Sequence, residues 1–311
     1  MSQFFTAAIL TATVAAGIQF SAPFLLAALG ETVGQRSGVL NLGVDGIMLL
    51  SAFGSYYTAL ETGNLALGVL VGIGVGVVMG LVTAFMSVTL KADQGISGIG
   101  VYLFGLGLSD LLFVKLVGTP QPVPTLHALD IPVLSRIPAL GHMFFKQNLL
   151  VYIAFLMVPV LTFVLRRTTI GTDVDATGEN PAAADSVGVD VARTRYLAVI
   201  FGCTMAGLAG ATLLILDGIF QENLTQSAGF IAVALVYFGA WRPTGVMAGS
   251  LLYGLVTAVI LQWKALGIIP TSAADLAATA PAVITVLALL TVSRRFRAPS
   301  ALGRPFVRGV T

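Results

Sequence analysis

The chain has 311 residues, of which 57% are apolar and 10% are charged. Its net charge is +2 and its mean hydropathy is +0.95. Soluble domains carry about 25% charged residues, so this composition excludes a water-soluble globular protein. At roughly 20 apolar residues per membrane span, the length accommodates about eight to ten helices. We therefore predict an all-α polytopic membrane protein with a single transmembrane domain over residues 1–311, and the small charge indicates no nucleic-acid partner.

Apolar stretches follow one another along the whole chain. The first runs from Phe4 to Leu29, and it is too long and too poorly flanked by basic residues to be a signal peptide. Further stretches fall at about 39–60, 65–90, 96–118, 148–166, 195–216, 227–240, 246–267 and 279–293. The stretch at 227–240 is short for a full crossing.

The basic residues predict the orientation, because Lys and Arg are retained on the cytoplasmic side of a membrane. With the C-terminus inside, twelve of the sixteen basic residues fall on the cytoplasmic side. The reverse topology inverts this bias. We therefore expect a cytoplasmic C-terminus, an external Pro-rich loop at 119–147 and a cytoplasmic loop at 167–194.

Glycines at helical spacing form a ridge within one predicted span. They are Gly68, Gly72, Gly76 and Gly80. In lipid, small residues on one ridge let helix backbones approach closely. We interpret this glycine ridge as a helix-packing surface and assign it no other role.

Polar residues are dense between Gly30 and Gly46, where a helix should cross the bilayer. Asn41 and Asp45 share one helix face, and glycines interrupt the segment. Such a composition favours a broken helix near residues 38–46 that lines a water-filled cavity. The alternative is a loop at the membrane interface. Residues at the start of the fourth span extend the polar set, and the predicted substrate path comprises Asn41, Asp45, Gln94, Ser97 and Phe104.

The cytoplasmic loop contains a local helix signal around residues 178–188. Asn180 suits an N-cap, Pro181 the first helical position, and Gly188 the end of the helix. A helix of about two turns is too short to be stable alone, so it must rest on something. It is either a surface helix on the membrane or a docking helix for a soluble partner.

No motif indicates catalysis, a metal or a cofactor. The sequence contains neither GxxxxGK[ST] nor a GxGxxG after a strand-like run. The histidines, His127 and His142, lie in the external loop without a cysteine or acidic cluster, which does not complete a zinc site. An intramembrane enzyme is therefore disfavoured. A secondary transporter remains an alternative, because Asp45 and Asp110 are embedded carboxylates.

Five stretches carry a resemblance to a known family. They are ALGETVGQRSGVLNLGVDGIMLLSA (28–52), KADQGISGIGVYLFGLG (91–107), GENPAAADSVGVDVARTRY (178–196), GFIAVALVYFGAWRPTGVMAGSLLYG (229–254) and ALGRPFVRG (301–309). The chain resembles the permease subunits of ATP-binding-cassette (ABC) importers of the ribose, branched-chain amino acid and nucleoside group, and most closely the nucleoside permeases. Asp45 stands where that family pattern usually has Glu.

The resemblance implies a transport subunit rather than an enzyme, in the plasma (inner) membrane of a prokaryote. It implies that a cytoplasmic ABC ATPase docks on a coupling helix in the loop at 167–194. The implied docking residues are Gly178, Glu179, Asn180, Pro181, Ala184, Asp185 and Gly188. It further implies an external substrate-binding protein and a second permease, related but distinct, that completes the path. A nucleoside-like solute is the expected substrate, and a ribose-type sugar is the alternative.

Overall fold

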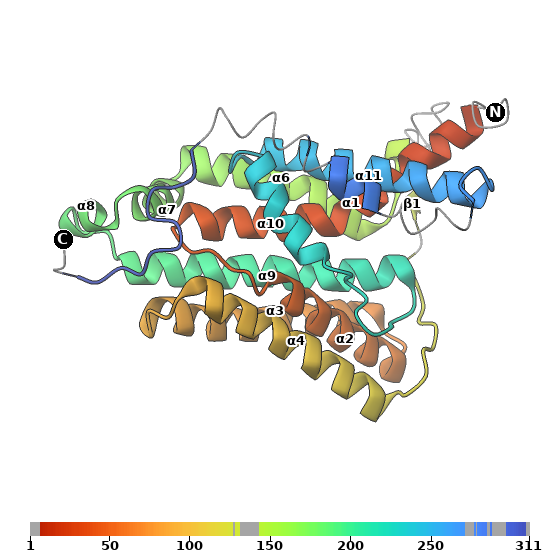
Figure 1. Ribbon diagram of the computed structural model, residues 1–311, viewed down its shortest axis with the longest axis horizontal. Helices are drawn as coiled ribbons and strands as arrows, with labels where there is room; N and C mark the ends of the chain where they lie inside the picture. Colours follow the sequence, from red (N-terminus) through yellow and green to blue (C-terminus); the bar gives the residue numbers. More distant parts are fainter. Residues whose placement is uncertain are drawn as a thin grey trace.

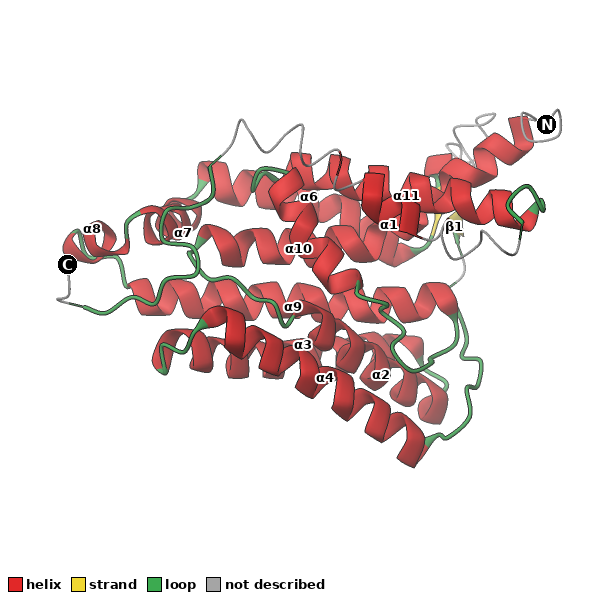
Figure 2. Ribbon diagram, in the orientation of Figure 1, coloured by secondary structure: helices red, strands yellow, loops and turns green. Residues whose placement is uncertain are grey.

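The protein is described by a computed structural model that places residues 7–126, 128–130, 143–270, 277, 279–284, 287 and 297–308. The described part is almost entirely helical, and most helices run along one long axis (Figures 1 and 2). A two-stranded antiparallel ladder joins β1 (Leu129–Asp130) to β2 (Lys146–Gln147). The helices are α1 (Ala7–Arg36), α2 (Val44–Thr62), α3 (Leu65–Ala84), α4 (Gln94–Leu116), α6 (Leu149–Arg167), α7 (Thr169–Glu179), α8 (Pro181–Ser186), α9 (Val191–Asp217), α10 (Ala228–Phe238) and α11 (Pro243–Ala265).

Within the described residues, six helices are long and apolar enough to cross a membrane: α1, α3, α4, α6, α9 and α11. A short π-helix, η1 (Phe85–Thr89), extends α3. The all-α polytopic fold is therefore confirmed, and the chain is a multi-pass membrane protein. Of the predicted stretch at 279–293, residues 285, 286 and 288–293 lie outside the described residues.

The centre of the bundle is α9, the most buried of these helices. It packs against α1 on one side and against α2 and α3 on the other (Figure 1). The glycine ridge of α3 lies in these contacts. A methyl group on Gly76 would lie 2.6 Å from the carbonyl oxygen of Cys203 in α9, and one on Gly68 would lie 2.7 Å from that of Ser55 in α2. Close approach of the three helices therefore depends on the missing side chains.

Two helices begin inside the bundle instead of at its ends. After α1, residues 37–43 run back without helical structure to the middle of the bundle, where α2 starts (Figure 1). After α9, residues 218–227 return in the same way to the start of α10. The predicted break near residues 38–46 is thus observed, and we call residues 37–43 the helix break. The 11-residue α10 is as short as its sequence indicated.

Two boundaries differ from the sequence-based prediction. The first span was expected to end at Leu29, but α1 continues to Arg36. The cytoplasmic loop was expected to hold one short helix, but it holds both α7 and α8. In each case the extra helical turns have polar partners elsewhere in the fold, which are described below.

Candidate functional site

Polar side chains hold the backbone of the helix break. The N–H of Leu40 donates to Oε1 of Gln94 at 2.8 Å, and the N–H of Asn41 donates to Oε1 of Glu31 at 3.0 Å. The Asn41 side chain accepts a hydrogen bond from the N–H of Gly43 at 2.9 Å. An unpaired N–H in apolar surroundings costs several kcal/mol. These polar residues therefore allow a non-helical segment to lie inside the bundle.

Asp45 joins the beginnings of the two internal helices. Its carboxylate accepts a 2.7 Å hydrogen bond from the N–H of Gly229 and a 3.2 Å hydrogen bond from the hydroxyl of Thr225. Asp45 lies in the first turn of α2, and Gly229 lies in the first turn of α10. The side chain is fully buried. A carboxylate here also compensates the partial positive charge of the α10 N-terminus.

The last turns of α1 extend this network to the next helix junction. The Gln35 side chain donates to Oε1 of Glu31 at 3.1 Å, and its own carbonyl oxygen accepts the indole N–H of Trp241 at 2.8 Å. Glu31 and Gln35 are both buried. Neither residue belongs to the substrate path predicted from the sequence. Their spacing of four residues at the end of an apolar helix is the signal that identifies such a pair.

The structure separates the predicted path residues into two places. Asn41, Asp45, Gln94 and Ser97 are all buried around the helix break. Phe104 lies elsewhere on α4, 56% exposed, along an apolar groove of about 910 Å³ between α2, α3 and α4. The first four residues are thus brought together, and Phe104 is not among them.

The short helix predicted in the cytoplasmic loop is present as α8. The Asn180 side chain accepts a hydrogen bond from the N–H of Ala183 at 3.0 Å, and Pro181 occupies the first helical position. Gly188 has a φ of +93°, a left-handed conformation that favours glycine after a helix. Ala184 is buried, so α8 packs on the rest of the protein through this residue. The exposed face of α8 consists of Ala182, Ala183, Ser186 and Val187.

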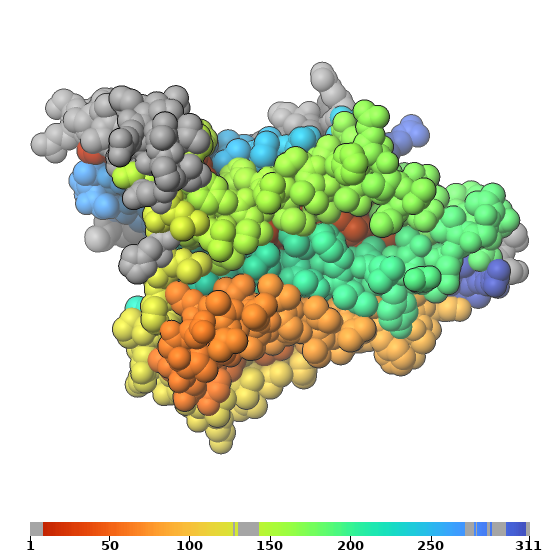
Figure 3. Space-filling view, turned by 180° about the vertical axis from the view of Figure 1, so that it is seen from behind, coloured from red at the N-terminus to blue at the C-terminus, as the bar shows by residue number. Residues whose placement is uncertain are grey.

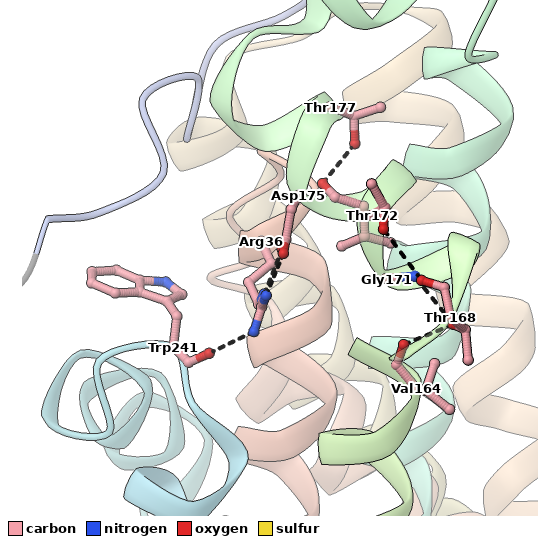
Figure 4. Close-up of polar contacts among 9 residues, drawn as sticks. Arg36, Val164, Thr168, Gly171, Thr172, Asp175, Thr177 and Trp241 are labelled. Atoms are coloured by element: carbon pink, nitrogen blue, oxygen red, sulfur yellow. Dashed lines mark hydrogen bonds and ion pairs between the residues drawn. The ribbon is translucent and has the colours of Figure 1, made fainter. Parts of the chain in front are cut away.

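An ion pair fixes α7 to the end of α1. Arg36 donates through Nε and Nη2 to the carboxylate of Asp175, at 2.7 and 2.5 Å (Figure 4). Its Nη1 donates to the carbonyl oxygen of Trp241 at 3.3 Å. The start of the cytoplasmic loop is thereby tied to the same helix end that holds the helix break.

The two acidic side chains of the predicted docking set are bonded to residues 297–308, which we call the tail. Glu179 accepts a hydrogen bond from the hydroxyl of Ser300, and Asp185 accepts one from Nε of Arg308, each at 2.9 Å. The tail (blue) lies at the same end of the molecule as α8 (green) in Figure 3. Gly178 lies against the carbonyl of Arg36, where a methyl group would not fit.

The described site combines a buried polar helix break with a short, largely exposed helix. Across the described residues, no group of three or more His, Cys, Asp or Glu side chains is placed to hold a metal ion. The last turns of α1 contact both the loop and the helix break: Arg36 bonds Asp175 in α7, and Glu31 bonds the backbone of Asn41.

Comparison with known proteins agrees with this architecture. Residues 13–292 match the family model described as the branched-chain amino acid transport system / permease component. A putative glucose ABC transporter permease of Haloferax volcanii is 40% identical over 85% of this chain and 80% of its own length. A guanosine ABC transporter permease of Bacillus subtilis is 33% identical over 97% of this chain and 98% of its own.

A nucleoside ABC transporter permease of Lactococcus lactis is 30% identical over 93% of this chain and 94% of its own length. No solved structure matches the chain. The family model covers well over half of the sequence, and these relatives are transport components rather than enzymes. The chain therefore belongs to the family of ABC transporter permeases of the branched-chain amino acid transport type.

Proposed function

We propose that this chain is the membrane subunit of an ATP-driven importer and forms half of the path for a nucleoside-like solute. The observation that carries the proposal is its similarity, over nearly the full length of each chain, to guanosine and nucleoside permeases. The buried helix break and its connection to the cytoplasmic loop support the same function. In this proposal the helix break opens as the path, and its connection to the cytoplasmic loop transmits the movement of the docked ATPase.

The proposed path runs along the helix break, past Asn41, Asp45, Gln94 and Ser97. In the present conformation these side chains are buried, and each of them bonds a backbone group. Opening the path exchanges those bonds for bonds to the hydroxyl groups and base edges of a nucleoside. Each side chain has at least one protein partner, but Nε2 of Gln94 is buried without one. The closed path therefore leaves one donor that a substrate would satisfy.

The proposed ATPase contact is the exposed face of α8. Gly178, Asn180, Pro181, Ala184 and Gly188 shape and anchor this helix, while Glu179 and Asp185 hold the tail against it. The small side chains Ala182 and Ala183 are exposed and leave the helix backbone accessible to a groove on the partner. Val187, 80% exposed, supplies an apolar contact next to them.

The remaining partners follow from the same proposal. A separate cytoplasmic ABC ATPase supplies hydrolysis, a related but distinct permease completes the path, and an external binding protein delivers the solute. The loop at 119–147 then faces outward, and the loop at 167–194 and the C-terminus face the cytoplasm of a prokaryotic cell. Few basic residues lie deep in the spans, which disfavours phosphorylated solutes.

A sugar is the second candidate substrate. The observation in its favour is the 40% identity to a putative glucose permease, although that alignment covers less of the chain than those with the nucleoside permeases. A sugar importer of this type allows two copies of one permease, whereas the nucleoside type calls for two distinct chains. The number of permease genes needed for uptake therefore separates the two candidates.

The test is uptake of radiolabelled guanosine and glucose into vesicles carrying this chain, the ATPase and the binding protein, with and without a second permease. We expect ATP-dependent guanosine uptake only with the second permease. Glucose uptake without it would replace the nucleoside assignment by the sugar assignment. Uptake driven by an ion gradient without ATP would overturn the importer assignment.

Docking on α8 is tested by copurification of the ATPase with variants of this chain. Ala183→Glu places a charge on the exposed face of α8 and is expected to abolish copurification of the ATPase. Thr172→Glu, an equal charge change at an exposed position on α7, is the matched control and should leave the complex intact. Equal recovery of ATPase with both variants would contradict docking on α8.

A further inference from the structure

A single buried arginine connects three segments that are distant in the sequence. Arg195, near the start of α9, is 2% exposed. Its guanidinium donates to the carbonyl oxygens of Ser37 at 3.1 Å, Arg304 at 3.0 Å and Thr177 at 3.4 Å. It forms no salt bridge with any of the described residues. Its hydrogen-bonding capacity is therefore used on backbone carbonyls.

The three carbonyls belong to the three parts of the molecule that the proposed transport cycle must coordinate. Ser37 is the first residue of the helix break, Thr177 lies near the end of α7 just before α8, and Arg304 is in the tail. Arginine suits this position because its planar guanidinium offers five N–H donors in a fixed geometry. A lysine ammonium has three donors on one atom and does not reproduce the same fork.

The tail reinforces this junction with backbone hydrogen bonds to both of its sides. The N–H of Ala301 donates to the carbonyl of Gly178 at 2.8 Å, at the end of α7. The N–H of Gly303 donates to the carbonyl of Gly38 at 3.1 Å, in the helix break. Two residues of the tail thus bridge the predicted docking region and the start of the path.

The backbone at Gly38 and the guanidinium of Arg195 are packed too closely for a side chain to lie between them. Gly38 has a φ of +92°, and a methyl group on it would lie 2.6 Å from Nη2 of Arg195. The tail then continues past α8, where Arg308 bonds Asp185. The connection therefore extends from the helix break to the outermost helix of the cytoplasmic loop.

We propose that Arg195 and the tail (residues 297–308) form a coupling joint that transmits the position of α8 to the helix break. The proposal rests on the proposed function, because it assumes that the ATPase acts on α8. Within the joint, Arg195 is a positioning residue that touches neither solute nor nucleotide. The tail is part of the joint, because Ala301 bonds the end of α7 and Gly303 bonds the helix break.

The test compares Arg195→Gln with Arg193→Gln in the full transporter reconstituted in proteoliposomes. Arg193 lies two residues earlier on the same helix and is exposed, so both variants lose the same charge at the same membrane face. The readouts are copurification of the ATPase and guanosine taken up per ATP hydrolysed. We expect both variants to retain the ATPase, and only Arg195→Gln to lower the uptake per ATP, by about fivefold or more.

A second pair of variants tests the joint at its exposed end. The Arg308 side chain is 81% exposed, so its replacement does not disturb the buried core. Arg308→Glu places a negative charge beside Asp185 and is expected to lower the uptake per ATP, whereas Arg308→Lys preserves the attraction and should restore it. This pair decides the question if Arg195→Gln does not fold.

The outcomes separate this proposal from the proposed function. Unchanged uptake per ATP in Arg195→Gln and Arg308→Glu, together with loss of the ATPase in Ala183→Glu, would overturn the joint and leave docking on α8 intact. An equal fall with Arg193→Gln would also overturn it, because charge at the membrane face would then be the cause. Retention of the ATPase by Ala183→Glu would instead reject docking on α8.

Discussion

Asp45 and Gly229, 184 residues apart in the chain, are joined by a 2.7 Å hydrogen bond from the backbone N–H of Gly229 to the Asp45 carboxylate. Both residues lie in the first turn of a helix that starts inside the bundle (Figure 1). A side chain at position 229 would overlap the backbone of Asp45, so glycine is required for this approach. One carboxylate thus fixes the relative position of α2 and α10.

The first prediction concerns the stability contributed by this carboxylate. Asp45→Ala leaves the N–H of Gly229 and the hydroxyl of Thr225 without a partner, at a cost of about 1–3 kcal/mol for each buried group. Asp45→Asn keeps one acceptor oxygen in place and should cost less. The free energy of unfolding, from denaturation of the purified permease in detergent, measures both. The interpretation fails if Asp45→Asn is the less stable of the two.

The second prediction concerns the glycine ridge. Gly76→Leu forces a side chain into the contact between α3 and α9 and should destabilise the protein by about 1–3 kcal/mol. Gly74 is the control, because a methyl group there meets no atom within 4 Å. Gly74→Leu should leave the thermal midpoint in detergent unchanged. Equal midpoints for the two variants would show that the ridge does not hold these helices together.

The third prediction concerns access to the helix break. Ser97 is 7% exposed, so in a Cys203→Ala background Ser97→Cys should react slowly with a charged thiol reagent in the resting transporter. During ATP turnover the opened path should admit the reagent, and excess guanosine should slow the reaction. Labelling followed by mass spectrometry measures the rate. A rate that ATP does not change would place Ser97 outside the path.

The fourth prediction concerns the surface around Phe104. Its 56% exposure along an apolar groove makes contact with lipid favourable. In the Cys203→Ala background, Phe104→Cys should therefore react with a lipid-soluble maleimide but not with a charged reagent, at rest or during turnover. Reaction with the charged reagent during turnover would return Phe104 to the substrate path.

The fifth prediction concerns the ion pair between Arg36 and Asp175. Both side chains are partly exposed, at 18% and 41%, and such pairs contribute about 0.2–1 kcal/mol to stability. Asp175→Asn should therefore leave the thermal midpoint almost unchanged. It should still lower guanosine uptake by about fivefold, because α7 loses its ion pair with α1. Normal uptake in this variant would mean that the ion pair has no part in coupling.

Much of the fold follows from local sequence signals. Apolar stretches predict the long helices, because a backbone in lipid must satisfy its own hydrogen bonds. The short helix α8 follows from Asn180, Pro181 and Gly188, since capping depends on neighbouring residues only. The helix break is predicted by its polar residues and glycines, because an uninterrupted membrane span would not contain so many of them.

The remaining features depend on partners that are distant in the chain. The extension of α1 to Arg36 requires Trp241 and Asp175, which bond Gln35 and Arg36. Helix α7 is rich in threonine and aspartate, which have low helix propensity. Its formation and its packing on α1 are therefore not predicted by the local sequence. In the sequence, Arg195 is one of the twelve basic residues that predict the cytoplasmic side. Its buried role is not predictable, because sequence does not reveal which carbonyls a guanidinium will reach.

The two helices that begin inside the bundle have a consequence for how the protein is made. Neither α2 nor α10 is among the described helices that are long and apolar enough to cross a membrane, yet both pack against helices that are. The backbone of residues 37–43 relies on Gln94, which is synthesised about fifty residues later. The helix break can therefore reach its final hydrogen bonding only after the residues around Gln94 have been synthesised.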